Sequence, residues 1–146
     1  MIELLIVDDH AIMRSGLSQI FALMPDIRVA GEARDGLDAL QLLSRRRVDL
    51  LLLDVNMPGI SGAELIKRLR QQHPTVPILI LSMYEQPHIA AVMLAVGASG
   101  YITKNCEPDI LLAAVRKVAG GGNYIDPMIA EKMAFSGSAT LRGSGG

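Results

Sequence analysis

Short apolar runs alternate along the chain with longer segments whose apolar residues recur at helical spacing. The short runs predict β-strands at Glu3–Val7, Ile27–Ala33, Asp49–Asp54, Pro77–Ser82 and Ser99–Thr103. The helical pattern is clearest at Met13, Leu17, Ile20 and Met24 and at Leu111, Ala114, Val115 and Val118. Further helices are predicted near residues 36–45, 62–72 and 86–96. This alternation predicts an α/β domain, in which helices cover both faces of a parallel sheet.

The strands differ in polarity, and this difference predicts their order in the sheet. Leu4–Val7, Leu50–Leu53 and Ile78–Leu81 are continuous apolar runs, as is typical of central strands buried on both faces. Residues 27–33 alternate in polarity and residues 99–103 are short and half polar, so both are predicted at the edges. The order 2-1-3-4-5 satisfies these assignments in a doubly wound, five-stranded sheet with right-handed crossovers.

Composition narrows the possible functions. The 146 residues suit one ordinary domain, and the net charge of -1 argues against nucleic-acid binding by this segment. The single cysteine, Cys106, excludes an internal disulfide. Because there is no leader-like start and no apolar stretch of about 18 residues, we expect a cytoplasmic protein without a membrane partner. The three histidines share no ligand spacing, so we do not expect them to form a metal cluster.

Polar side chains follow the ends of the predicted strands. Open parallel sheets bind ligands beyond the carboxyl ends of their strands, where the strand order reverses. That reversal is predicted here between the first and third strands. The side chains at these ends are Asp8, Asp9, Asp54, Ser82 and Lys104. Each alone has an ordinary explanation, such as a helix cap or a surface lysine, but together the complementary groups favour a shared site.

The side chains expected at this shared site carry opposite charges that suit phosphoryl transfer. Carboxylates that lie close together repel one another, and each raises the pKa of the others. A divalent cation relieves this repulsion, and oxygen ligands suit Mg²⁺. Asp54 then has an oxygen that can attack phosphorus. Mg²⁺ and the Lys104 ammonium would neutralise the phosphoryl oxygens, and the Ser82 hydroxyl would donate a hydrogen bond to one of them.

Four segments together resemble the receiver domain of two-component response regulators, over about residues 2–126. They are "IVDDH", "LLLLDVNMPGISG", "ILILS" and "GASGYITKN". Three others, "DDHAIMRSGL", "AGEARDG" and "EPDILLAAVRKVAGGGNYIDP", resemble the NarL/FixJ type. The resemblance implies a flavodoxin-like fold. It also implies a signalling switch that a sensor histidine kinase phosphorylates, and not a turnover enzyme.

The resemblance assigns a role to each residue of the expected site. Asp54 matches the phosphoacceptor, and Lys104 matches the lysine that pairs with the phosphoryl group. Asp8 and Asp9 match the acidic pair that binds Mg²⁺, and Asp54 is expected to be a ligand of the same ion. Asn56 matches the position whose backbone carbonyl is a further Mg²⁺ ligand.

Further positions match the parts of a receiver that respond to phosphorylation. Ser82 and Tyr101 match the switch hydroxyl and the switch aromatic residue. Asn56 and Tyr84 lie two residues past Asp54 and Ser82, where side chains tune the lifetime of the acyl phosphate. One departure is Asn105, because many receivers have a proline with a cis bond after the lysine. The geometry of the Lys104–Asn105 bond is left open.

The chain is expected to consist of two parts, a receiver and a short C-terminal segment. Residues 1–126 match the receiver, and residues 127–146 read as a short helix followed by a Gly/Ser-rich linker or tail. The NarL/FixJ resemblance implies a C-terminal helix-turn-helix that binds DNA and regulates transcription. Residues 127–146 are too few to form that domain, so we expect it to be absent from this chain. We expect DNA binding to require that domain. A stand-alone receiver that acts through protein contacts is the alternative, and homodimer formation on phosphorylation is left open.

Three rival classes are less consistent with the residues. A haloacid-dehalogenase-type phosphatase needs an aspartate two residues after the nucleophile, where this chain has Asn56. A flavodoxin needs a phosphate-binding loop after the first strand, where this chain has Asp8 and Asp9. A receiver-like module that is not phosphorylated would not need Asp54 and Lys104 together with the acidic pair.

Overall fold

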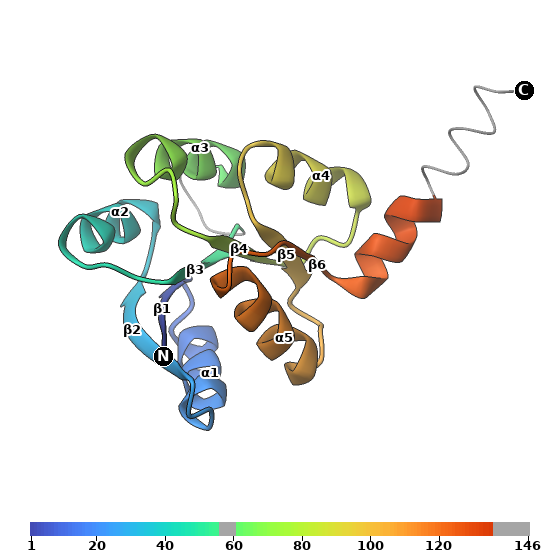
Figure 1. Cartoon of the computed structure of the whole chain (residues 1–146). Coiled ribbons are helices and arrows are strands. Elements are labelled where there is room, and N and C mark those ends of the chain that lie inside the picture. Colours follow the sequence, from blue (N-terminus) through green and yellow to red (C-terminus); the bar gives the residue numbers. More distant parts are fainter. Residues whose placement is uncertain (56–60, 136–146) are drawn as a thin grey trace, which may run out of the picture.

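The computed structural model describes residues 1–55 and 61–135, which form a layered α/β domain (Figure 1). Within these residues the strands form one parallel sheet in the order β2-β1-β3-β4-β5-β6. The strands are β1 (Ile2–Val7), β2 (Ile27–Ala33), β3 (Leu50–Asp54), β4 (Ile78–Ser82), β5 (Gly100–Thr103) and β6 (Tyr124–Ile125). The predicted order of the first five strands is therefore confirmed.

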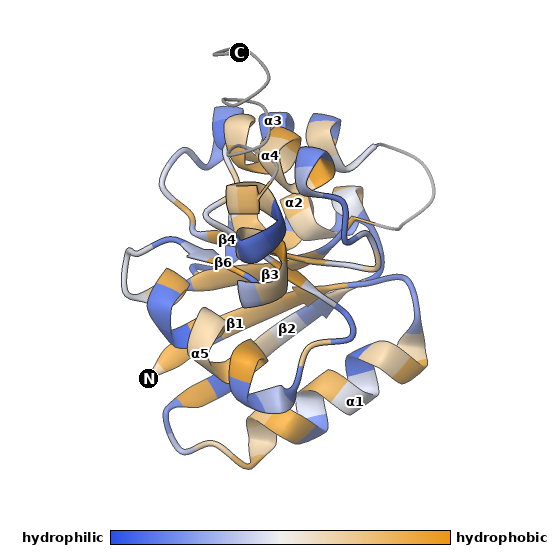
Figure 2. Cartoon of the chain, turned by 90° about the vertical axis from the view of Figure 1, so that its right-hand side faces the viewer, coloured by the Kyte–Doolittle hydropathy of each residue, from blue (hydrophilic) through white to orange (hydrophobic). Residues whose placement is uncertain are grey.

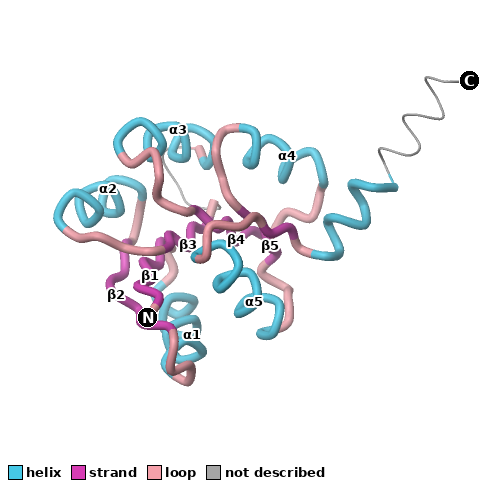
Figure 3. The backbone as a smooth tube through the Cα atoms, viewed as in Figure 1, coloured by secondary structure: helices cyan, strands magenta, loops and turns pink. Residues whose placement is uncertain are grey.

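Helices cover both faces of this sheet, as predicted. They are α1 (Ala11–Ala22), α2 (Gly36–Arg45), α3 (Gly62–Gln72), α4 (Pro87–Ala95) and α5 (Pro108–Ala119). Figure 3 shows α1 and α5 on one face and α2, α3 and α4 on the other. A further helix at 127–135 follows β6 and lies beyond the β6 edge of the sheet (Figure 1).

The expectation of a five-stranded sheet ending at residues 99–103 was wrong. The short strand β6 pairs with β5, and all four residues of β5 are buried. A Cβ atom at Gly100 would lie 2.8 Å from the backbone oxygen of Tyr124, so the glycine permits this close pairing. A two-residue strand has too little periodicity to be predicted from the sequence.

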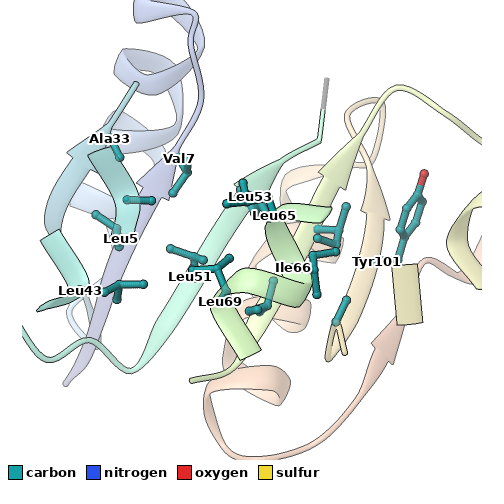
Figure 4. Packing of buried hydrophobic residues seen from close by; sticks show 14 of the residues in the cluster. Leu5, Val7, Ala33, Leu43, Leu51, Leu53, Leu65, Ile66, Leu69 and Tyr101 are labelled. Carbon is teal, nitrogen blue, oxygen red and sulfur yellow. The ribbon is translucent and has the colours of Figure 1, made fainter. Parts of the chain in front are cut away.

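The core has two layers, one on each face of the sheet. Alternate side chains of a strand point to opposite faces, so consecutive leucines of β3 enter different layers. Leu51 and Leu53 pack with Leu65 and Ile66 of α3 (Figure 4), whereas Leu50 and Leu52 pack with the α1 and α5 side. Figure 2 shows the central strands as mainly hydrophobic and many loops as hydrophilic. Burial of each such side chain stabilises the fold by about 1.5–3 kcal/mol.

Candidate functional site

The carboxyl ends of four strands place the predicted site residues at one edge of the sheet. Asp8 and Asp9 follow β1, and Asp54 is the last residue of the neighbouring strand β3. Ser82 ends β4, and Lys104 follows β5. The backbone N–H of Lys104 donates to the carbonyl of Ser82, 2.8 Å away, and this bond holds the ends of β4 and β5 together.

Lys104 and Asp54 form a nearly buried ion pair. The Lys104 Nζ atom lies 3.1 Å from Asp54 Oδ2 and 4.0 Å from Asp8 Oδ2. Both carboxylates are almost fully buried, and the lysine side chain is 10% exposed. Charges interact more strongly there than in water, so the ammonium group offsets part of the negative charge of the acidic side chains.

The acidic side chains are arranged in a way that fits a metal ion. One ligand atom from each of Asp8, Asp9, His10 and Asp54 lies within 4.8 Å of the others. Asp8 Oδ2 is buried and has no hydrogen-bond partner among the described residues. Carboxylate oxygens are the ligands that Mg²⁺ prefers, so these residues fit the expected ion. Asn56, whose carbonyl was expected to bind Mg²⁺, lies outside the described residues.

His10 is a member of this group that was not predicted from the sequence. Its Nδ1 atom lies 2.9 Å from Asp9 Oδ1 and 3.2 Å from Asp8 Oδ1. The spacing of the three histidines does not indicate a site at His10, because the partners of His10 are aspartates. The position of His10 directly after two aspartates was the signal that could have identified it.

The predicted switch residues are linked through Tyr84. The buried Ser82 Oγ accepts a hydrogen bond from the Tyr84 N–H, 3.0 Å away, and the Tyr101 hydroxyl donates to the Tyr84 carbonyl at 2.8 Å. The Tyr101 ring is buried at the edge of the core layer (Figure 4), and this burial raises the pKa of its hydroxyl. No peptide bond of the described residues is cis, so the Lys104–Asn105 bond is trans.

Asp126 is a second residue whose role was not predicted. Its buried carboxylate accepts from the backbone N–H and the hydroxyl of Thr103, at 3.1 and 3.2 Å. Its other oxygen accepts from the N–H of Met128 in the first turn of helix 127–135. The Lys132 Nζ atom of that helix lies 3.7 Å from Glu85 Oε2, and Ile129 is fully buried. An aspartate before a proline at a helix start was the available signal.

Comparison with known proteins assigns this fold and site to a family. Residues 4–116 match the model of the response regulator receiver domain. The chain therefore belongs to the response regulator receiver family, whose members are signalling proteins.

Individual relatives agree with this assignment. The chain is 42% identical over 134 residues to the transcriptional regulatory protein UhpA of Salmonella typhimurium, covering 92% of this chain and 67% of UhpA. It is 36% identical over 132 residues to DegU of Brevibacillus brevis, covering 90% of this chain and 56% of DegU. A crystal structure of a LuxR-family two-component response regulator from Aurantimonas sp. SI85-9A1 matches with a TM-score of 0.89 and 31% identity, over 93% of this chain and 97% of that one.

The matched length and the helices add two facts. The chain spans only 56% to 67% of the lengths of these two curated relatives. None of the helices within residues 1–55 and 61–135 is long and apolar enough to cross a membrane.

Proposed function

We propose that Asp54 accepts a phosphoryl group from a phosphohistidine of a sensor histidine kinase. One observation carries the proposal, namely that the buried Asp54 carboxylate ends a central strand 3.1 Å from the Lys104 ammonium and beside the acidic pair. In the reaction an Asp54 oxygen forms a bond to phosphorus while the bond between phosphorus and the histidine nitrogen breaks. Such transfer depends mainly on positioning and charge neutralisation.

The residues around Asp54 have separate roles in positioning and neutralising the phosphoryl group. Asp8, Asp9 and Asp54 would hold Mg²⁺, with the Asn56 carbonyl as a further ligand. The bound ion would supply positive charge next to the phosphoryl oxygens. The Lys104 ammonium pairs with a phosphoryl oxygen once Asp54 is phosphorylated. The Ser82 hydroxyl accepts from the Tyr84 N–H and retains its own proton for donation to another oxygen.

Tyr84, which is half-exposed, and Asn56 set the lifetime of the acyl phosphate by controlling the approach of water. Ser82 and Tyr101 transmit the phosphorylated state to the surface around β5. The chain is thereby a switch that is reset by hydrolysis, and not an enzyme that turns over a substrate.

We further propose that this switch regulates transcription through a DNA-binding output domain. The proposal rests on the names of UhpA and DegU, both transcriptional regulatory proteins, and on the greater length of these relatives. Phosphorylation-dependent homodimers would present two such domains. The alternative is a stand-alone receiver that acts through protein contacts, and specific binding of promoter DNA by full-length protein separates the two.

Incubation with acetyl phosphate tests whether Asp54 is the phosphoacceptor. Intact-mass measurement should show one added phosphoryl group in the wild type with Mg²⁺, and none in Asp54→Asn or in excess chelator. Asp109→Asn, which changes an exposed aspartate of α5, is the matched control and should be labelled normally. Full labelling of Asp54→Asn would overturn the proposal.

A further inference from the structure

A cavity lies at the amino-terminal ends of β3 and β4. Its walls include residues 46–49, between α2 and β3, and residues 73–77, between α3 and β4. Its volume is about 660 Å³, within the range of about 300–1,000 Å³ that is typical of small-molecule sites. Since β3 and β4 run parallel from this edge to Asp54 and Ser82, the cavity is one strand length away from the candidate site.

The lining of this cavity is basic. Arg45, Arg46 and Arg47 contribute to it, together with the carboxylate of Asp49. The Asp49 Oδ2 atom accepts a hydrogen bond from the backbone N–H of Glu3, 2.8 Å away, so this carboxylate is engaged by β1. The arginines outweigh it in charge, and the cavity therefore attracts anions.

The end of α2 accounts for only one of these arginines. Arg45 lies in the last turn, where a cation offsets the negative end of the helix dipole, and its Nε atom lies 3.5 Å from the carbonyl oxygen of Gln41. Arg46 and Arg47 follow that turn and are exposed. Their side chains make no ion pair or hydrogen bond within the described part of the chain, so both guanidinium groups are available to an anion.

His73 gives an independent sign of a ligand at the same place. It is the C-cap residue of α3 and contributes to the lining of the cavity. Its Nε2 atom is buried and has no hydrogen-bond partner among the described residues. Such an atom destabilises a fold unless a bound molecule satisfies it. A ligand with hydroxyl or phosphate groups would supply this partner.

The lining defines the chemical class of the ligand. Guanidinium groups bind phosphate oxygens through paired hydrogen bonds. Leu43, Val48 and Val76 add apolar surface to the same cavity, and its volume far exceeds that of a single phosphate ion. A nucleotide combines phosphates with a flat, largely apolar base. A nucleic acid fits less well, because the whole chain has a net charge of -1.

We propose that this cavity binds a nucleotide, with its phosphates on Arg46 and Arg47 and its base against the apolar side chains. The bound molecule would join the loop before β3 to the loop before β4. The site is distinct from the acidic group around Asp54, so the inference does not depend on phosphoryl transfer.

Calorimetric titration of the chain with ADP tests the site. EDTA is included, so that no divalent cation carries ADP to the acidic group. ADP should bind, and adenosine, which lacks the phosphates, should not. Arg46→Gln and Arg47→Gln should each weaken ADP binding by about tenfold or more, because each removes charged hydrogen bonds to phosphate. Arg34→Gln, at an exposed arginine between β2 and α2, is the matched control and should bind ADP as the wild type does.

Nuclear magnetic resonance locates the bound molecule. ADP should shift the amide signals of residues 45–49 and 73–76 and the imidazole signals of His73. No binding at about 1 mM ADP, equal affinity for adenosine and ADP, or equal ADP affinity in Arg46→Gln, Arg47→Gln and wild type would overturn the inference. Shifts centred on Asp54, or tighter binding of a single-stranded oligonucleotide than of ADP, would also overturn it.

Discussion

The phenolic hydroxyl of Tyr101 donates a hydrogen bond to the backbone carbonyl of Tyr84, 2.8 Å away. This bond ties β5 to the loop between β4 and α4, and the same Tyr84 donates its N–H to Ser82. We expect phosphorylation to draw the Ser82 hydroxyl towards the phosphoryl group, and the Tyr101 ring to fill the space that this hydroxyl vacates. In this structure the Tyr101 ring is fully buried.

Tyr101→Phe keeps the buried ring and removes the hydrogen bond to Tyr84. We expect the free energy of unfolding to fall by about 0.5–1.5 kcal/mol, as for one lost hydrogen bond. Amide exchange at Tyr84 should become faster, because the loop loses its attachment to β5. Tyr124→Phe is the control, since the Tyr124 hydroxyl makes no hydrogen bond within the described part of the chain. Equal exchange in both variants would contradict the prediction.

Lys104→Ala removes the positive charge that lies within 4.0 Å of both Asp54 and Asp8. We expect tighter Mg²⁺ binding, because no ammonium then competes with the ion for the carboxylates. Labelling by acetyl phosphate should nevertheless slow by about tenfold or more, because a charge that stabilises the transferring group is lost. Calorimetry and timed intact-mass measurements test these opposite effects, and Lys67→Ala on α3 serves as the control. Weaker Mg²⁺ binding in Lys104→Ala would rule out this competition.

Asp126→Ala removes the acceptor of the two Thr103 hydrogen bonds and of the Met128 N–H. We expect a loss of about 1–3 kcal/mol in stability, because buried donors on Thr103 lose their partner. Hydrogen exchange should increase most in helix 127–135, which loses its attachment to β5. The control is Asp109→Ala, at an exposed aspartate. Unchanged protection of residues 127–135 would show that the carboxylate does not hold this helix.

Two glycines should respond to alanine in opposite directions. A Cβ atom at Gly16 of α1 meets nothing within 4 Å, so Gly16→Ala should stabilise the helix by about 0.5–1 kcal/mol. Gly97 has φ +126°, and a Cβ atom there would lie 2.8 Å from the Arg70 side chain. Gly97→Ala should therefore destabilise the protein by more than about 1 kcal/mol. Urea unfolding of both variants tests the pair, and a stabilised Gly97→Ala would refute the steric explanation.

The sequence by itself determined the strands β1–β5, their order in the sheet, the helices between them and the position of the candidate site. Periodicity separates strands from helices, and the unbroken leucines of β3 identify a central strand. Because parallel strands end at a common edge, the order of the strands alone brings Asp8, Asp54 and Lys104 to one place.

Only the tertiary structure decided the contacts that depend on side-chain direction or on pairing between distant segments. The imidazole of His10 could have capped α1, but hydrogen bonding to Asp8 turns it towards the carboxylates. The strand β6 exists because Gly100 admits Tyr124 closely, and Asp126 gains its function from Thr103, 23 residues away. Local patterns give only a weak signal for such contacts, since they do not fix where a side chain points or which distant segment lies beside it.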